Sequence, residues 1–258
     1  MNLFCSARIR FGALAVFGGF AIAAALSAQT CTPPDELKPK LRDRPSTAVL
    51  NDLGVWFAGK EQYACAANAF GSSLQGDPAQ PDLPHVVFEF GVSLYLSGDS
   101  KEAIPSLQEA ENLGYRDSKI YLILATALDS THATGEAEAE WRKALAFDPE
   151  NTAALDALSS DLLADGDFGG VIELLDRPRL TAERSPQQAM NLGAAYAKSG
   201  KFEDAVRLLQ DGLNTNPDSF ELAQQLAGVL TQLGREDEAA MVLQLAQARR
   251  QQNAAPGK

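Results

Sequence analysis

The chain has 258 residues, of which 45% are apolar, and its formal net charge is −12. So many apolar residues can bury a continuous core, but 2 Trp and 5 Tyr provide few large anchors, so alanines must do much of the packing. A strongly negative surface repels phosphates, which argues against nucleic acid as a partner. The acidity is typical of a soluble surface, with a cationic partner as the alternative.

Residues 1–28 have the composition of a signal peptide. Arg8 and Arg10 precede an apolar run over 11–26, and small residues follow up to Ala28. Cleavage after Ala28 is preferred, with Ala25 as the alternative. The apolar run also approaches membrane-spanning length, so an uncleaved anchor that keeps the N-terminus at a membrane is the rival interpretation. Either way, the rest of the chain is expected to be exported, periplasmic or secreted.

Two features follow this leader. Residues 29–46 contain four prolines among charged residues, which predicts an extended, Pro-rich linker. Once Cys5 is lost with the leader, Cys31 and Cys65 remain in a compartment where disulfides persist. We expect them to pair and to pin the N-terminal edge of the helices that follow, with free thiols or an intermolecular bridge as alternatives.

From Thr47 onward the chain alternates two amphipathic helical patterns, and one pair of patterns repeats every 34 residues. Three sets of residues, which we call columns, each recur at one fixed position of the unit, and all three share this period in one register. The first column is Gly91, Ala125, Ser159, Gly193 and Ala227; the second is Ala103, Ala137, Val171, Ala205 and Ala239; the third is Leu107, Trp141, Leu175, Leu209 and Leu243. Three columns in phase indicate stacked units that complete one another's core.

The first unit resembles the tetratricopeptide repeat (TPR). It has the small or bulky residue that this family places at each of six positions, namely Gly54, Phe57, Ala66, Phe70, Ser73 and Pro78. The resemblance implies an all-α fold, a right-handed α-solenoid of about six helix-turn-helix repeats. The expected repeats are 47–80, 84–117, 118–151, 152–185, 186–219 and 220–253, followed by a disordered tail over 254–258.

The repeat at 152–185 is degenerate. Gly169 and Gly170 weaken the start of its second helix, and Pro178 stands where a small helical residue belongs. We expect this helix to end near Asp176 and an irregular loop to follow. Simple divergence and a functional joint are both compatible with this pattern.

Members of this family usually bind extended peptides or helices in a concave groove lined by the first helix of each repeat. Carried over position by position, the resemblance implies a partner-binding groove formed by Val55, Phe88, Val92, Tyr95, Lys119, Leu122, Thr126, Asp129, Met190, Asn191 and Lys198. Phe88 and Leu122 are equally compatible with core packing. The Lys and Asn residues with which some family members clamp acidic peptide tails are missing, since Asn51, Val55, Phe88 and Val92 occupy those positions.

No catalytic, metal or cofactor site is expected. The two histidines, His85 and His132, lie in different repeats without a metal-site spacing. The acidic residues at 161, 165 and 167 lack the twelfth-position Glu of a calcium loop. The sequence therefore predicts a non-catalytic adaptor or scaffold of the periplasm or cell envelope that binds a protein or peptide rather than a small-molecule substrate.

The alternative is a structural subunit of an envelope or secretion complex that docks through its convex or terminal surfaces. The last predicted helix, over about 236–250, favours such docking because no further helix is predicted to cover its apolar side. Self-association is one form that it could take.

Overall fold

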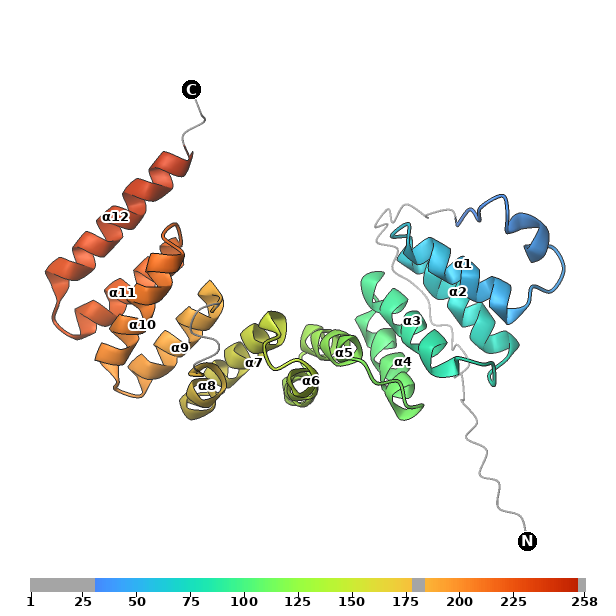
Figure 1. Ribbon diagram of the computed structural model, residues 1–258, viewed down its shortest axis with the longest axis horizontal. Helices are drawn as coiled ribbons and strands as arrows, with labels where there is room; N and C mark the ends of the chain where they lie inside the picture. The colour runs from blue at the N-terminus through green and yellow to red at the C-terminus, as the bar shows by residue number, and fades with distance from the viewer. Residues whose placement is uncertain (1–30, 178–183, 255–258) are drawn as a thin grey trace, which may run out of the picture. The chain divides into compact units, whose positions relative to one another are not determined.

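The structure is a computed structural model that describes residues 31–177 and 184–254. The expected leader, residues 178–183 of the irregular loop expected after Asp176, and residues 255–258 lie outside these ranges. Within the described residues the only regular elements are helices (Figure 1). A short 3-10 helix, η1, precedes twelve α-helices.

The bounds of these elements are as follows. They are η1 Lys38–Leu41, α1 Thr47–Ala58, α2 Tyr63–Gly76, α3 Leu83–Leu96, α4 Ser100–Asn112, α5 Ser118–Ser130, α6 Thr134–Phe147, α7 Thr152–Ala164, α8 Phe168–Leu175, α9 Pro186–Lys198, α10 Phe202–Thr215, α11 Phe220–Gln232 and α12 Glu236–Ala254.

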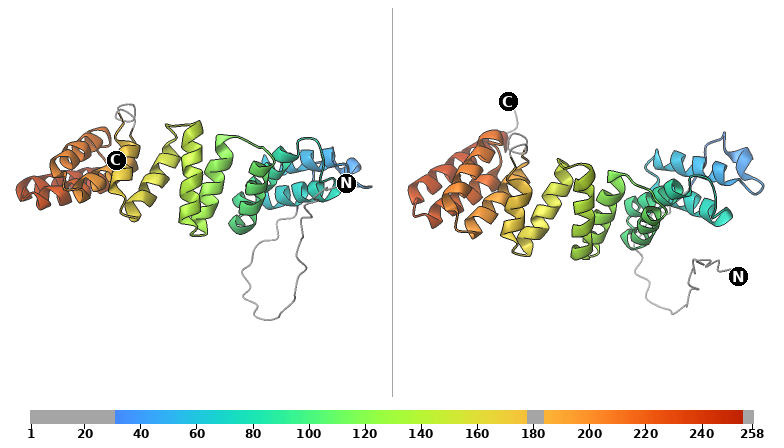
Figure 2. Two further views of the ribbon diagram at one scale, coloured as in Figure 1. Left: turned by 90° about the horizontal axis from the view of Figure 1, so that it is seen from below. Right: turned by 60° about the horizontal axis from the view of Figure 1, so that its bottom comes forward.

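Each repeat predicted from the sequence contains one pair of these helices, an odd-numbered helix A and an even-numbered helix B. The two helices of a repeat pack on each other, and α2, α4, α6, α8 and α10 each also contact the helix A that follows. Two further views show the same succession of neighbouring helices (Figure 2). The prediction of an all-α TPR solenoid is confirmed.

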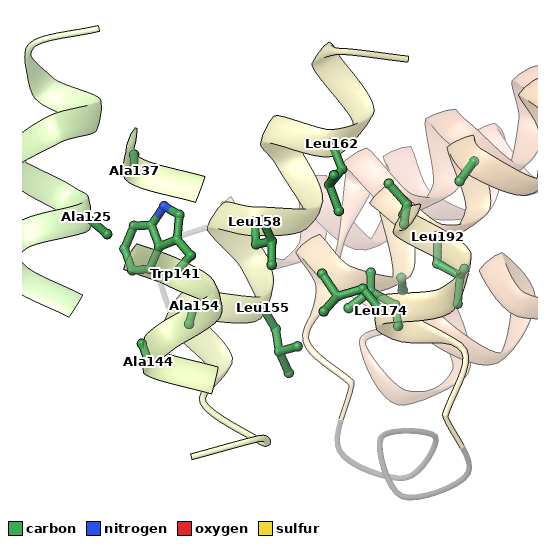
Figure 3. Packing of buried hydrophobic residues seen from close by; sticks show 14 of the residues in the cluster. Ala125, Ala137, Trp141, Ala144, Ala154, Leu155, Leu158, Leu162, Leu174 and Leu192 are labelled. Carbon is green, nitrogen blue, oxygen red and sulfur yellow. The ribbon is translucent and has the colours of Figure 1, made fainter. Parts of the chain in front are cut away.

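Small residues let helices A and B approach closely. A Cβ added at Gly91 would lie 2.8 Å from Leu107 Cγ, and one added at Gly193 would lie 2.7 Å from Leu209 Cδ2. In the third repeat Trp141 fills the space instead, among Ala125, Ala137 and Ala144 (Figure 3). The repeating columns are therefore contacts of small residues with bulky ones, which explains why they share one register.

The turn between helices A and B has one backbone conformation in all six repeats. Its key residue has a positive φ, and it is Gly98, Gly166, Gly200 or Gly234 in four repeats but Glu61 and His132 in the other two. Glycine adopts this conformation without steric cost, whereas other residues do so with strain. His132 is thus a turn residue.

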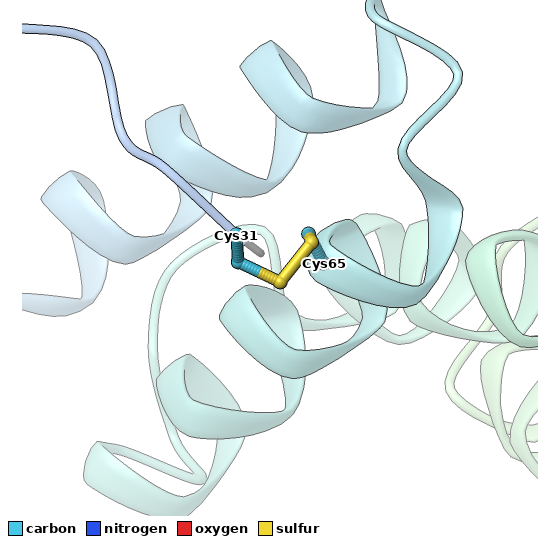
Figure 4. Close-up of a disulfide and its surroundings, with 2 residues drawn as sticks. All are labelled: Cys31 and Cys65. Atoms are coloured by element: carbon cyan, nitrogen blue, oxygen red, sulfur yellow. A yellow bond between two sulfur atoms is a disulfide. The ribbon is translucent and has the colours of Figure 1, made fainter. Parts of the chain in front are cut away.

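The segment before the first repeat is more ordered than expected. Instead of an extended linker, it forms η1, and Leu37 and Leu41 pack against the core of α1 and α2. Cys31 and Cys65 form a disulfide across a sequence separation of 34 residues (Figure 4). Cys65 is buried, in the cluster against which Leu37 and Leu41 pack. The prolines did not prevent packing, because Leu37 and Leu41 lie between them in the sequence and pack on this core.

The fourth repeat deviates as predicted. Its helix B, α8, has 8 residues and ends at Leu175, whereas α6 and α10 have 14 residues each. The helix nevertheless keeps its members of the second and third columns in the core, because Val171 and Leu175 are fully buried. Helix α9 contacts α7 as well as α8, and consecutive A helices also touch elsewhere, as α9 does with α11.

Candidate partner-binding surface

The first helices of the repeats carry the residues that sequence reasoning assigned to a binding groove. The structure divides these residues into exposed, half-buried and buried groups. Val55, Lys119 and Lys198 are exposed; Val92, Tyr95, Leu122, Thr126, Asp129 and Met190 are half-buried; Phe88 and Asn191 are buried. We call the exposed and half-buried members the helix A surface.

Apolar side chains of the helix A surface concentrate on two neighbouring helices. Val92 and Tyr95 on α3 and Leu122 on α5 pack partly against the main core and keep part of their area exposed. Helices α3 and α5 contact each other directly. These three residues therefore provide an apolar area on adjacent repeats, with the exposed Lys119 at the start of α5.

Phe88 belongs to the core rather than to an open surface. Its ring stacks on the ring of Tyr115 at a centroid distance of 4.3 Å. The ring of His85 also stacks on Tyr115, at a centroid distance of 5.9 Å. Tyr115 occupies the position where other repeats have the closing proline. Burial raises the pKa of Tyr115, helped by the nearby charges of Asp117 and Glu89. A shallow cavity of about 330 Å³ adjoins this stack, with His85, Tyr115 and Arg116 in its wall.

The polar members of the helix A surface already have partners. Thr126 donates its hydroxyl to the carbonyl of Leu122 at 2.7 Å. Asp129 accepts a hydrogen bond from Trp141 Nε1 at 3.1 Å, and burial raises the pKa of this carboxyl group. Sequence reasoning assigned Asp129 to the groove; in the structure its carboxylate is half-buried and holds the buried indole of Trp141.

Asp129 faces a second acidic group on the next repeat. The pKa of Asp161 on α7 is raised to about 6, first by burial and then by the charges of Asp129, Asp165 and Glu138. Asp129 Oδ1 and Asp161 Oδ2 are both buried without a hydrogen-bond partner. Part of the Asp161 population is thus protonated near neutral pH.

Asn191 is part of a polar contact between α7 and α9. Its side-chain amide donates to Ser159 Oγ at 2.7 Å and to Ser160 Oγ at 3.0 Å, while its Oδ1 accepts from Gln187 at 2.9 Å. The buried Gln188 donates to Asp156 Oδ1 at 2.8 Å, as does the Ser185 hydroxyl. We call this set of bonds the α7–α9 network. Sequence reasoning assigned Asn191 to the groove, but the structure places it in this network.

The short helix α8 leaves a cavity of about 500 Å³ beside α10. Asp176, Arg184, Tyr196, Arg207 and Asp211 line part of it. Tyr196 donates its hydroxyl to Asp176 at 2.6 Å, and burial together with this bond raises the tyrosine pKa to about 12. Arg184 donates to the carbonyl of Leu175 at 3.0 Å, at the end of α8.

Two features of the described residues bear on function. They contain no group of three or more His, Cys, Asp or Glu residues arranged to hold a metal ion. None of the helices in the described ranges combines the length and the apolar character that crossing a bilayer requires.

Known proteins share this architecture. Residues 196–256 match the family model of the tetratricopeptide repeat. No curated protein matches the sequence. The fold resembles that of a TPR protein from Parabacteroides merdae, with a TM-score of 0.63 and 16% identity over 79% of each chain.

MamA proteins are also similar in structure. The chain of MamA from Desulfovibrio magneticus RS-1 gives a TM-score of 0.60 at 17% identity, covering 69% of this chain and 100% of that one. MamA MSR-1 gives 0.55 at 19% identity, covering 67% and 100%. At these identities the likeness shows the fold alone, a solenoid of TPRs.

Proposed function

Because the chain is a tetratricopeptide-repeat protein, we propose that it is a non-catalytic scaffold that binds a peptide or a partner helix on its helix A surface. The observation that carries this proposal is the apolar area of Val92, Tyr95 and Leu122 on two adjacent repeats. Half-buried side chains of this kind are held in place by the core yet retain area for a ligand, so binding costs little side-chain entropy.

Affinity and selectivity have separate sources in this proposal. The apolar area, with Tyr95 as its aromatic anchor, provides most of the affinity. Lys119 and Lys198 are exposed and can pair with acidic groups of a ligand. Phe88 and Asn191 act indirectly, because their burial fixes the helices that carry the exposed residues.

A double variant tests this function. Tyr95→Ala with Lys119→Glu is compared with the wild-type protein in pull-downs from periplasmic extract, using the full chain with a C-terminal tag. We expect loss of the specific partner. Lys101→Glu with Leu113→Ala is the matched control, because both residues are exposed, Lys101 on α4, a helix B, and Leu113 directly after its end.

Each outcome separates the two functional hypotheses. If the α3 and α5 changes leave the partner in place, binding on the helix A surface is refuted. Loss of the partner in the control alone supports the alternative, a structural subunit that assembles through its helix B side. The exposed Leu113 and Phe147, which close α4 and α6 at equivalent repeat positions, favour that alternative.

We further propose that the scaffold works in an exported compartment. The disulfide between Cys31 and Cys65 supports this, because such bonds persist mainly in oxidising compartments. The charged and apolar pattern of residues 1–28 supports it independently. Cell fractionation followed by N-terminal sequencing provides the test. A periplasmic protein beginning at Gln29 is expected, an intact N-terminus in the membrane fraction would indicate an anchor, and a cytoplasmic protein would overturn export.

A further inference from the structure

The two cysteines of the disulfide lie in different surroundings. Cys31 is at the beginning of the described residues and is exposed, whereas Cys65 is 1% exposed in a cluster with Phe57 and Phe70 (Figure 4). In thiol–disulfide exchange a thiolate attacks one of the two sulfur atoms along the axis of their bond, so access decides which sulfur reacts. The approach to Cys65 Sγ leads through the packed cluster, whereas Cys31 Sγ can be approached from solvent.

Residues 31–46, which we call the strap, lie against the first repeat. Leu37 and Leu41 pack on its cluster, and both remain half-buried. The backbone hydrogen bonds of η1 and of the residue before it are made within the strap. Two half-buried leucines offset little of the conformational entropy that a released chain regains, so the disulfide is the main restraint on the strap.

We propose that Cys31 is the site at which an external dithiol reduces this disulfide, and that reduction releases the strap from the first repeat. A thiolate of the dithiol attacks Cys31 Sγ and forms a mixed disulfide there. The bond to Cys65 breaks, and its electron pair leaves on Cys65 Sγ, which takes a proton from water. The second thiolate of the dithiol then attacks the dithiol sulfur of the mixed disulfide, and Cys31 leaves and is protonated. The dithiol is oxidised to a disulfide, and both cysteines are reduced to thiols.

The position of Cys65 suits the leaving sulfur. It is the third residue of α2 and therefore lies in the first turn of this helix. The N–H groups of a first turn favour negative charge, which offsets part of the cost of forming a thiolate in a buried place. Once the strap has left, solvent reaches Cys65 and the part of the cluster that Leu37 and Leu41 had covered.

The strap therefore couples the redox state of the surroundings to the first repeat. In the oxidised chain the strap covers the cluster of this repeat, and in the reduced chain the cluster is partly uncovered. The proposal is independent of the helix A surface, because Val92, Tyr95 and Leu122 lie on α3 and α5 and take no part in it. Its failure would leave the proposed function unchanged.

Reduced glutathione shows which sulfur is attacked. The full chain carrying Cys5→Ser, with its disulfide formed, is exposed briefly to glutathione, quenched with acid and mapped by mass spectrometry. We expect glutathione on Cys31 in excess over Cys65, on the order of tenfold. The same chain unfolded in urea is the control, and there the preference should disappear. Equal labelling of the two cysteines in the folded chain, or an excess on Cys65, would overturn the assignment.

Tryptic cleavage after Lys40 and Arg42 reports release of the strap, because both residues are exposed within it. Dithiothreitol should accelerate these two cleavages on the order of tenfold relative to cleavage after Lys201, which is exposed before α10. Cleavage after Lys60, between α1 and α2, distinguishes release of the strap from unfolding of the whole repeat. Equal acceleration after Lys60 would contradict the proposal.

A variant without the disulfide completes the test. Cys31→Ser with Cys65→Ser should be cleaved in the strap at the rate of the reduced wild-type chain and should not respond to dithiothreitol. Circular dichroism establishes that this variant is folded. If reduction leaves cleavage of the wild-type strap unchanged, Leu37 and Leu41 hold the strap without the disulfide, and its release is refuted.

Discussion

Glu61 and His132 adopt a backbone conformation that glycine provides at the same position of the other four repeats. Their φ angles are 58° and 63°. Neither side chain is buried, so only the backbone distinguishes these turns from the others. His132 is one of two histidines in the chain, and the sequence predicted no catalytic or metal-binding role for it; the left-handed turn explains its position.

Replacing either residue with glycine should stabilise the protein. Glu61→Gly and His132→Gly relieve left-handed strain worth about 1 kcal/mol each, partly offset by the greater freedom of glycine in the unfolded chain. Thermal and urea unfolding measure the gain. The opposite change, Gly200→Ala, should lower the unfolding free energy, and a lower Tm for both glycine variants would contradict this account.

A carboxyl group between the third and fourth repeats should make stability depend on pH. The pKa of Asp161 is about 6, above its ordinary value of 3.8, so the folded protein binds this proton more tightly than the unfolded chain does. Stability from this group is therefore present at low pH and is lost as the pH rises through about 4 to 6. Ionised Asp161 destabilises the folded protein above that range.

Asp161→Asn should consequently raise the Tm near pH 7.5 and have a smaller effect near pH 4, about the pKa of the unfolded carboxyl group. Differential scanning calorimetry across this range provides the measurement. Asp218→Asn is the control, because Asp218 is exposed, belongs to the fifth repeat and is not among the charges that raise the pKa of Asp161. An Asp161→Asn effect that is the same at both pH values would show that the carboxyl group is not buried beside Asp129.

At the scale of elements, the fourth repeat shows how a short helix is accommodated. Helix α8 lacks the last turns of its counterparts, and α9 contacts α7 as well as α8. The α7–α9 network supplies hydrogen bonds at this contact, with Gln188 and Asn191 buried. Divergence of the repeat thus did not leave an open joint, since polar groups on α7 and α9 satisfy one another.

Asn191→Ala should destabilise the protein by about 1 to 3 kcal/mol, because it leaves the buried Ser159 hydroxyl without this partner. Gln187→Ala is the control, since Gln187 is exposed and bonds only to Asn191 within this network. Urea denaturation compares the two. Equal losses would mean that the buried bonds contribute no more than a surface contact.

At the scale of the whole molecule, the first repeat has its own small core. Leu53, Phe57 and Phe70 belong to a cluster distinct from the one that runs through the later repeats. The disulfide holds the segment with η1 against this cluster. Repeat proteins unfold by units when neighbouring contacts weaken, so the first repeat should be the most sensitive to loss of the disulfide.

Reduction of the disulfide should therefore separate the unfolding of the first repeat from that of the rest. Closing this loop is worth about 3 to 4 kcal/mol on the chain-entropy model. The two tryptophans report on different repeats, Trp56 on the first and Trp141 on the third. In single-tryptophan variants, reduction should shift the Trp56 transition strongly and the Trp141 transition little; equal shifts would contradict independent units.

The sequence by itself predicted the helical pairs and an early end of α8, near Asp176. These follow from the local spacing of small, bulky and helix-breaking residues, which needs no knowledge of distant contacts. It also placed Cys31 within reach of Cys65. Helix periodicity could not decide which groove positions remain exposed, because exposure depends on what the neighbouring repeat places against them.

Tertiary structure alone therefore decided which of the predicted groove residues remain exposed in the candidate site. Tyr115 covers Phe88, and α7 covers Asn191, whereas Val92 and Tyr95 remain partly open. The same reason applies to the N-terminal segment, where prolines predicted extension but Leu37 and Leu41 found a core to pack on. Local pattern sets the helices, and burial between them sets which side chains remain available for a partner.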